Sequence, residues 1–81
     1  MTITVLFFAM LRSAVGADKA SLEVAPGCSA GEAATLVQSR WPQLDGWMAC
    51  SRLAVNGAYP QPGAPLSDGD ELAIIPPVSG G

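Results

Sequence analysis

One segment of this chain has the features of a helix, and segments typical of β-strands precede and follow it. Ser29 and Glu32 have the spacing of a capping box, in which Ser29 accepts a hydrogen bond from a free backbone N–H and Glu32 reaches back to the cap. Pro42 ends the helical pattern, because proline disfavours a helical conformation at the residue before it. The apolar stripe between these signals consists of Ala33, Leu36, Val37 and Trp41. We therefore expect an amphipathic helix that packs on a sheet.

The strand signals lie on both sides of this helix. Residues 2–10 are rich in β-branched and aromatic side chains and contain no glycine or proline, which predicts a strand. Both of its faces carry apolar groups, since Ile3, Val5 and Phe7 alternate with Thr4, Leu6 and Phe8. This strand is therefore central, or its outer face meets a partner. Further strands are predicted at residues 20–24, 52–56 and 71–75, with a short extended piece that begins at Tyr59.

The predicted order is strand, strand, helix, strand, short strand, strand. Strands interrupted by one helix favour a single sheet with the helix on one face. We expect the α+β class and, by analogy, the β-grasp fold: a mixed sheet of four to five strands whose first and last strands are central and parallel. With 81 residues there is room for one domain. We assign residues 1–75 to it and residues 76–81 to a flexible, extended C-terminal tail.

Composition and charge restrict the possible partners. The chain is 49% hydrophobic and only 14% charged, so a domain of this size should leave an apolar patch exposed for a protein partner. The net charge is −3 and the four cations are scattered, which argues against nucleic-acid binding and favours a basic partner surface. No apolar run approaches the roughly 20 residues of a membrane span.

Residues that could carry chemistry are scarce in the body of the chain. Histidine is absent, which removes the usual general base and the commonest metal ligand. Cys28 has no cation near it in the sequence to activate it as a nucleophile. With Cys50 it could form one disulfide, although two free thiols in a reducing compartment are the expected state. The acidic group Asp68, Asp70 and Glu71 fits a solvated turn better than a cation site, so we expect no metal.

The N-terminal region could be mistaken for a secretion signal, because residues 3–11 form an apolar run. Its nearby cation, Arg12, follows the run instead of preceding it, and cleavage would remove the best predicted strand. We therefore expect a cytoplasmic protein.

The C-terminal end is the remaining candidate for function. Pro76 and Pro77 stiffen the exit from the last strand, and the chain finishes with Gly80 and Gly81, which have no side chains. From Pro76 the end can reach roughly 20 Å if it is extended. Such an end could thread a narrow tunnel and place its carboxylate in another protein's active site. The alternative is a frayed terminus, which is common for glycine tails.

Two stretches of the sequence resemble a known family. Residues 54–81, AVNGAYPQPGAPLSDGDELAIIPPVSGG, and residues 5–12, VLFFAMLR, are similar to the small, sulfur-carrying subunit of molybdopterin synthase, a family of the ubiquitin-like β-grasp superfamily. The selective part is DGDE followed by PPVSGG. The similarity is weak over residues 18–51.

The resemblance implies a carrier that is not an enzyme on its own and binds no cofactor. An adenylyltransferase of the ubiquitin-activating type would consume ATP to adenylate the Gly81 carboxylate, and a sulfur donor enzyme would convert it to a thiocarboxylate, 1-thioglycine. The tail would then insert into the large catalytic subunit and deliver sulfur to cyclic pyranopterin monophosphate, which becomes molybdopterin. The assembly would hold two small and two large subunits. The residues implied in insertion are Pro76, Pro77, Val78, Ser79 and Gly80.

The resemblance also implies partner contacts at Phe8, Tyr59 and Ile75, with Tyr59 departing from the more aliphatic pattern of the family. Three other functions stay open. The chain could carry sulfur in thiamine-thiazole or cysteine synthesis, it could be a ubiquitin-like protein modifier, or it could be a β-grasp binding module with an inert tail.

Overall fold

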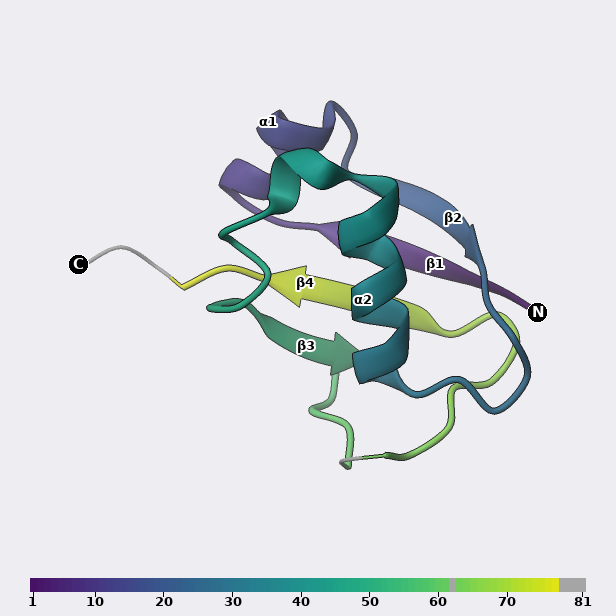
Figure 1. Ribbon diagram of the computed structural model, residues 1–81. Coiled ribbons are helices and arrows are strands. Elements are labelled where there is room, and N and C mark those ends of the chain that lie inside the picture. The colour runs from purple at the N-terminus through teal and green to yellow at the C-terminus, as the bar shows by residue number, and fades with distance from the viewer. Residues whose placement is uncertain (62, 78–81) are drawn as a thin grey trace.

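A four-stranded sheet with one main helix across one face makes up the chain as the computed structural model describes it, over residues 1–61 and 63–77 (Figure 1). The short helix α1 and the 3₁₀ helix η1 lie at one end of the sheet. The elements in order are β1 (Thr2–Phe7), α1 (Met10–Val15), β2 (Lys19–Glu23), α2 (Ala30–Arg40), η1 (Pro42–Leu44), β3 (Arg52–Val55) and β4 (Glu71–Ile75).

The first and last strands are the two central strands. The order across the sheet is β2-β1-β4-β3, with β1 and β4 parallel and each edge strand antiparallel to its neighbour. Val5 lies opposite Leu72, and Phe7 lies opposite Ile74. The predicted α+β, β-grasp fold is confirmed, with four strands.

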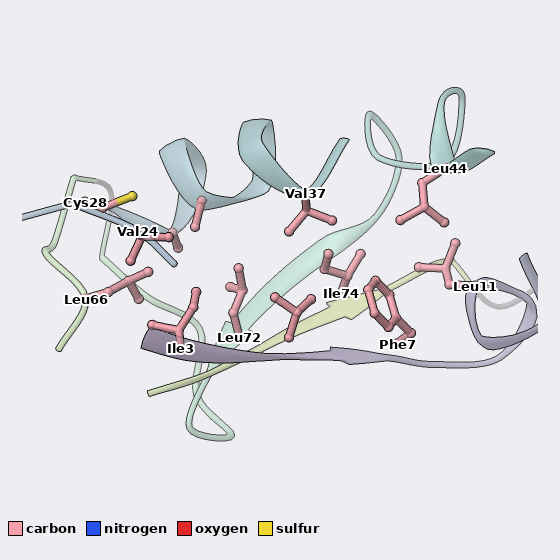
Figure 2. Close-up of a cluster of buried hydrophobic side chains, with 13 residues drawn as sticks. Ile3, Phe7, Leu11, Val24, Cys28, Val37, Leu44, Leu66, Leu72 and Ile74 are labelled. Carbon is pink, nitrogen blue, oxygen red and sulfur yellow. The ribbon is translucent and has the colours of Figure 1, made fainter. Parts of the chain in front are cut away.

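The hydrophobic core lies between α2 and the sheet (Figure 2). Alternate residues of β1 and β4 point toward the helix, which contributes Ala30, Ala33 and Val37. Leu11 of α1 and Leu44 of η1 close the core at one end and are fully buried. The Phe7 and Trp41 rings meet edge to face, with 5.1 Å between their centroids. The sheet residues in this core are Ile3, Val5, Phe7, Leu72 and Ile74.

Helix α2 begins with the predicted capping box. The Ser29 hydroxyl accepts a hydrogen bond from the Glu32 N–H at 3.2 Å, and the Glu32 carboxylate accepts one from the Ser29 N–H at 3.1 Å. The predicted apolar stripe was wrong at one position. Leu36 is 42% exposed, because Ala33 and Val37 already define the face that meets the sheet.

The first strand is shorter than the sequence predicted, because a turn and α1 follow it directly. β1 ends at Phe7, and Ala9 takes a positive φ of 53° with ψ of −129°. The Leu11 N–H donates to the Phe8 carbonyl at 3.1 Å, so residues 8–11 form a type II′ turn with Ala9 at the position that favours glycine. The turn directs Leu11 into the core, which is the physical reason for ending the strand there. We did not predict α1.

The segment between α2 and β3, which the sequence left unassigned, is a 3₁₀ helix followed by turns. After β3, Asn56 and Gly57 both have positive φ and form the predicted tight turn. Val55 and Ala58 exchange backbone hydrogen bonds across it at 2.8 and 3.1 Å. This isolated bridge is the extent of β pairing there, so the extended piece predicted at Tyr59 is not a strand.

A hydrogen-bond network joins that turn to the start of β4. Asp70 accepts hydrogen bonds from the Ser67 N–H at 2.7 Å and from the Asn56 side-chain amide at 2.9 Å. The Asn56 side-chain oxygen in turn accepts from the Glu71 N–H at 2.9 Å. The Ser67 N–H, followed by the Asn56 amide, holds the pKa of the Asp70 carboxyl below its usual range. Asp68 also caps backbone, since it accepts from the Thr2 N–H at 2.8 Å.

We expect Ala9→Gly to raise the free energy of unfolding by about 1 kcal/mol, because glycine removes the strain of positive φ at the cost of a smaller entropy term. Urea denaturation measures the change. Ala25→Gly is the matched control, since Ala25 is exposed and has no positive φ. It should destabilise the protein slightly, and equal effects from both substitutions would contradict the strain.

We expect part of the stability of the fold to depend on ionised Asp70. Its pKa is lowered in the folded protein, so its contribution is present above the ordinary value of 3.8 and is lost as the pH falls through the folded value. Urea denaturation from pH 6 to pH 2 should therefore show the difference between wild type and Asp70→Asn shrinking with acid. Asp18→Asn is the control, because Asp18 is exposed and its carboxylate makes none of the side-chain hydrogen bonds found over residues 1–61 and 63–77, and an equal trend in that variant would contradict the role of the Asp70 network.

Candidate functional site

The face of the sheet opposite α2 carries a shallow apolar hollow. It has a volume of about 330 Å³. We call it the open-face hollow and define it by its lining residues: Leu6, Phe8, Ala54, Gly57, Tyr59, Glu71, Ala73 and Ile75.

Strand register explains why these residues gather. Ala73 lies opposite Leu6 on one side and opposite Ala54 on the other, so one row of side chains crosses the three strands. Ala54 and Ala73 are only 6% and 7% exposed, although neither belongs to the core cluster under α2. The small side chains of Ala73, in the middle of the row, and Ala54, at its β3 end, give the hollow its floor, and larger side chains around them form its walls.

The three residues expected to contact a partner all line this hollow. Phe8 is 46% exposed and Tyr59 is 68% exposed, whereas Ile75 is half-buried. Phe8 and Tyr59 are thus not covered by the loops that the structure describes. We missed the alanine floor, although the alternation in residues 52–56 and 71–75 already places Ala54 and Ala73 on one face.

The C-terminal exit adjoins the open-face hollow. A second hollow of about 330 Å³ is lined by Cys50, Arg52, Ile75, Pro76 and Pro77, so Ile75 borders both. Pro76 is buried and Pro77 is exposed, which places the departure of the chain from the body between them. The other residues expected in the tail, Val78, Ser79, Gly80 and Gly81, lie outside the described residues.

The cysteines are free thiols, so the alternative of a disulfide between them is wrong. Burial raises the pKa of the Cys28 thiol, and the negative charge of Glu32 raises it further. A raised pKa disfavours the nucleophilic thiolate, which fits a packing role for Cys28. Cys50 is exposed, and its thiol lies 3.3 Å from the Trp47 carbonyl oxygen.

The described part of the chain contains neither a cluster of metal ligands nor a helix able to span a membrane. Over residues 1–61 and 63–77, no three acidic, cysteine or histidine side chains gather as metal ligands would. Asp68 accepts a hydrogen bond from the Thr2 N–H at the start of β1, and Asp70 accepts one from the Ser67 N–H of its own turn. None of the helices described has the length and apolar character needed to cross a membrane.

Comparison with known proteins gives the family. Residues 5–81 match the model of the ThiS family. The chain is 39% identical to the molybdopterin synthase sulfur carrier subunit of Chlamydomonas reinhardtii, with all of both chains covered. It is 42% identical to the subunit of the same name from Escherichia coli, over 98% of this chain and 99% of that one.

Solved structures agree on the fold. SAMP1, the small archaeal modifier protein 1 of Haloferax volcanii, superposes with a TM-score of 0.88 at 26% identity over the full length of both chains. A chain from the complex of subunits 1 and 2 of molybdopterin-converting factor from Helicobacter pylori superposes with a TM-score of 0.72 over the full length of both. At 23% identity, that second likeness supports the fold alone. The chain belongs to the ThiS family, and the two relatives above, which match it from end to end, are sulfur carrier subunits of molybdopterin synthase.

Proposed function

We propose that this chain is the sulfur carrier subunit of a molybdopterin synthase. The observation that carries the proposal is the end-to-end match to subunits of that name, in a family match that runs through Gly81. The open-face hollow supports it, because an exposed apolar surface beside the C-terminal exit is suited to hold a partner while the tail is used. Such a carrier is non-catalytic on its own, and we place it in the cytoplasm.

The proposed working parts are a body and a tail. Residues 1–75 form the body, and residues 76–81 form the tail, which starts at Pro76, still packed against the body, and enters the partner with the residues that follow. Pro76 and Pro77 direct the chain away from the sheet, because proline fixes φ near −65°. Ser79 and Val78 follow, and Gly80 leaves the least possible bulk beside the reacting end at Gly81.

The chemistry of the tail requires activation from outside. A carboxylate resists nucleophilic attack, so one of its oxygens must first attack the α-phosphate of ATP, forming the Gly81 acyl-adenylate and releasing pyrophosphate. A sulfur nucleophile supplied by a donor enzyme then displaces AMP and leaves the thiocarboxylate, 1-thioglycine. We assign the first step to an adenylyltransferase of the ubiquitin-activating type.

Delivery of the sulfur requires the large catalytic subunit. The open-face hollow, with Phe8, Tyr59 and Ile75 around it, is the proposed docking surface for that subunit. Its catalytic groups would transfer sulfur from Gly81 to cyclic pyranopterin monophosphate, twice for each molybdopterin. We propose an assembly of two small and two large subunits.

A protein modifier is the second candidate function. The likeness to the small archaeal modifier protein 1 favours it, since that chain has the same fold over its full length. In a modifier the activated Gly81 would form an amide with a lysine of a target protein instead of accepting sulfur. Both functions use the same first step, so the product separates them.

We expect incubation with ATP, the activating enzyme and a sulfur donor to raise the intact mass by about 16 Da, because sulfur replaces one carboxylate oxygen. Intact-protein mass spectrometry measures the gain, and conversion of the pterin by the large subunit measures delivery. Deleting Gly81 should abolish both, while the surface control Asp18→Asn should retain both. Conjugates of much higher mass without the gain would favour the modifier, and pterin conversion by the deletion variant would overturn the carrier.

We expect Phe8→Ala and Tyr59→Ala each to weaken binding of the large subunit by about 2 kcal/mol, close to 30-fold in Kd, because aromatic anchors dominate interface energies. Isothermal titration calorimetry gives the affinity. Leu36→Ala is the control, since Leu36 is about as exposed as Phe8 but lies on α2, across the sheet from the hollow. Unchanged binding by both aromatic variants would place the docking surface elsewhere.

A further inference from the structure

Opposite charges lie at the two ends of the open-face hollow. Glu71, the first residue of β4, lines the hollow at one end. Arg52 lies opposite Ile75, the last residue of β4, and borders the adjoining hollow at the C-terminal exit. The four residue steps between Glu71 and Ile75 separate the two ends by about 13 Å along the strand.

Both charges are available to a partner. Each side chain is exposed, and among residues 1–61 and 63–77 the recorded ion pair joins the amino terminus to Glu23, with neither Arg52 nor Glu71 taking part. Glu71 does have a backbone role, through its N–H, but its carboxylate makes none of the side-chain hydrogen bonds found in this part of the chain. Within residues 1–61 and 63–77, neither the Arg52 guanidinium nor the Glu71 carboxylate is taken up by a charge of opposite sign.

The separation of the charges makes them act as two independent contacts. At physiological ionic strength the screening length is about 8 Å, which is shorter than the distance between them. A partner turned by half a revolution on the same apolar surface would meet the opposite charge at each end. Like charges placed together at an interface disfavour the wrong arrangement, and complementary ones accelerate the right one.

We propose that the docking face of the large subunit carries a carboxylate opposite Arg52 and a cation opposite Glu71, on the two sides of an apolar centre. This inference rests on the proposed function. It adds the charges expected on the partner and explains how they would orient it. The apolar hollow would contribute binding energy without fixing how the partner is oriented. The two charges would favour the one orientation in which the C-terminal exit points into the partner. The partner's carboxylate then lies at the side of the opening that receives the tail.

A charge swap tests the direction without altering the net charge. The variant Arg52→Glu with Glu71→Arg keeps the net charge of the chain but reverses the order of the charges across the hollow. The matched control is Arg12→Asp with Asp18→Arg, since these exposed residues line a separate hollow with Ser13, Gly16 and Ala17. Stopped-flow or surface-based kinetics with the full-length chain and the large subunit of the same organism give the association rate.

We expect the Arg52 and Glu71 swap to lower the association rate about tenfold at low salt, and the gap to close as salt screens the charges. The control swap should stay within about twofold of wild type. Thermal unfolding checks that each variant folds. If the swap variant does not fold, the single substitutions Arg52→Gln and Glu71→Gln replace it in the same rate measurement. Association of the folded swap variant, or of both single-substitution variants, at the wild-type rate would overturn the inference while leaving the proposed function intact.

A second measurement identifies the partner's carboxylate. Arg52→Lys keeps the charge and provides an amine, which a carbodiimide joins to a neighbouring carboxylate as an amide. We expect a cross-linked peptide between position 52 and an aspartate or glutamate of the large subunit. Cross-linking of that lysine to sites scattered over the partner would contradict a defined pair. Failure of the wild-type chain to bind the large subunit at all would instead overturn the proposed function, and the inference with it.

Discussion

The parallel pairing of β1 with β4 is the interaction on which the rest of the structure depends. It brings the first and last strands together at the centre of the sheet, where β1 and β4 each have a hydrogen-bonded neighbour on both sides. Because successive side chains of a strand point to opposite faces, the same two strands supply the core under α2 and the apolar surface on the other side. Ile74 and Ile75 show the division, since the first is fully buried in the core and the second borders both hollows. The paired strands β1 and β4 therefore supply side chains both to the core under α2 and to the open-face hollow on the other side of the sheet.

Much of this arrangement could be predicted from the sequence because its signals are local. The capping box at Ser29 and Glu32, the alternation in β1 and the turn at Asn56 and Gly57 each depend on residues within a few positions of one another. The helix α1 escaped prediction because it has six residues and buries only Leu11, which is too little for a visible period. The strain at Ala9 was equally hidden, since alanine gives no sign of positive φ.

Part of the candidate site could be predicted from the sequence. The residues that could not be predicted are those brought together only by pairing between strands. Phe8 and Ile75 fall on the outer face by simple alternation, and the partner contacts expected of them came from the resemblance of the sequence. The charges at Arg52 and Glu71 were invisible as a pair, because nothing but the register of β3 on β4 places them at opposite ends of one surface. The floor made by Ala54 and Ala73 likewise requires knowing which residues lie side by side across strands.

The burial of Pro76 next to Ile75 has a consequence for how deep the tail can go. Ile75 belongs to the surface that would hold the partner, and Pro76 is anchored against the body, so the tail begins at a fixed point relative to any docked protein. The position of the reacting end then depends on the number of residues after that point, at no more than about 3.3–3.6 Å for each. One residue more or less would displace the carboxylate by more than two covalent bond lengths. In such an arrangement the length of the tail is itself a determinant of catalysis, independent of which side chains it carries.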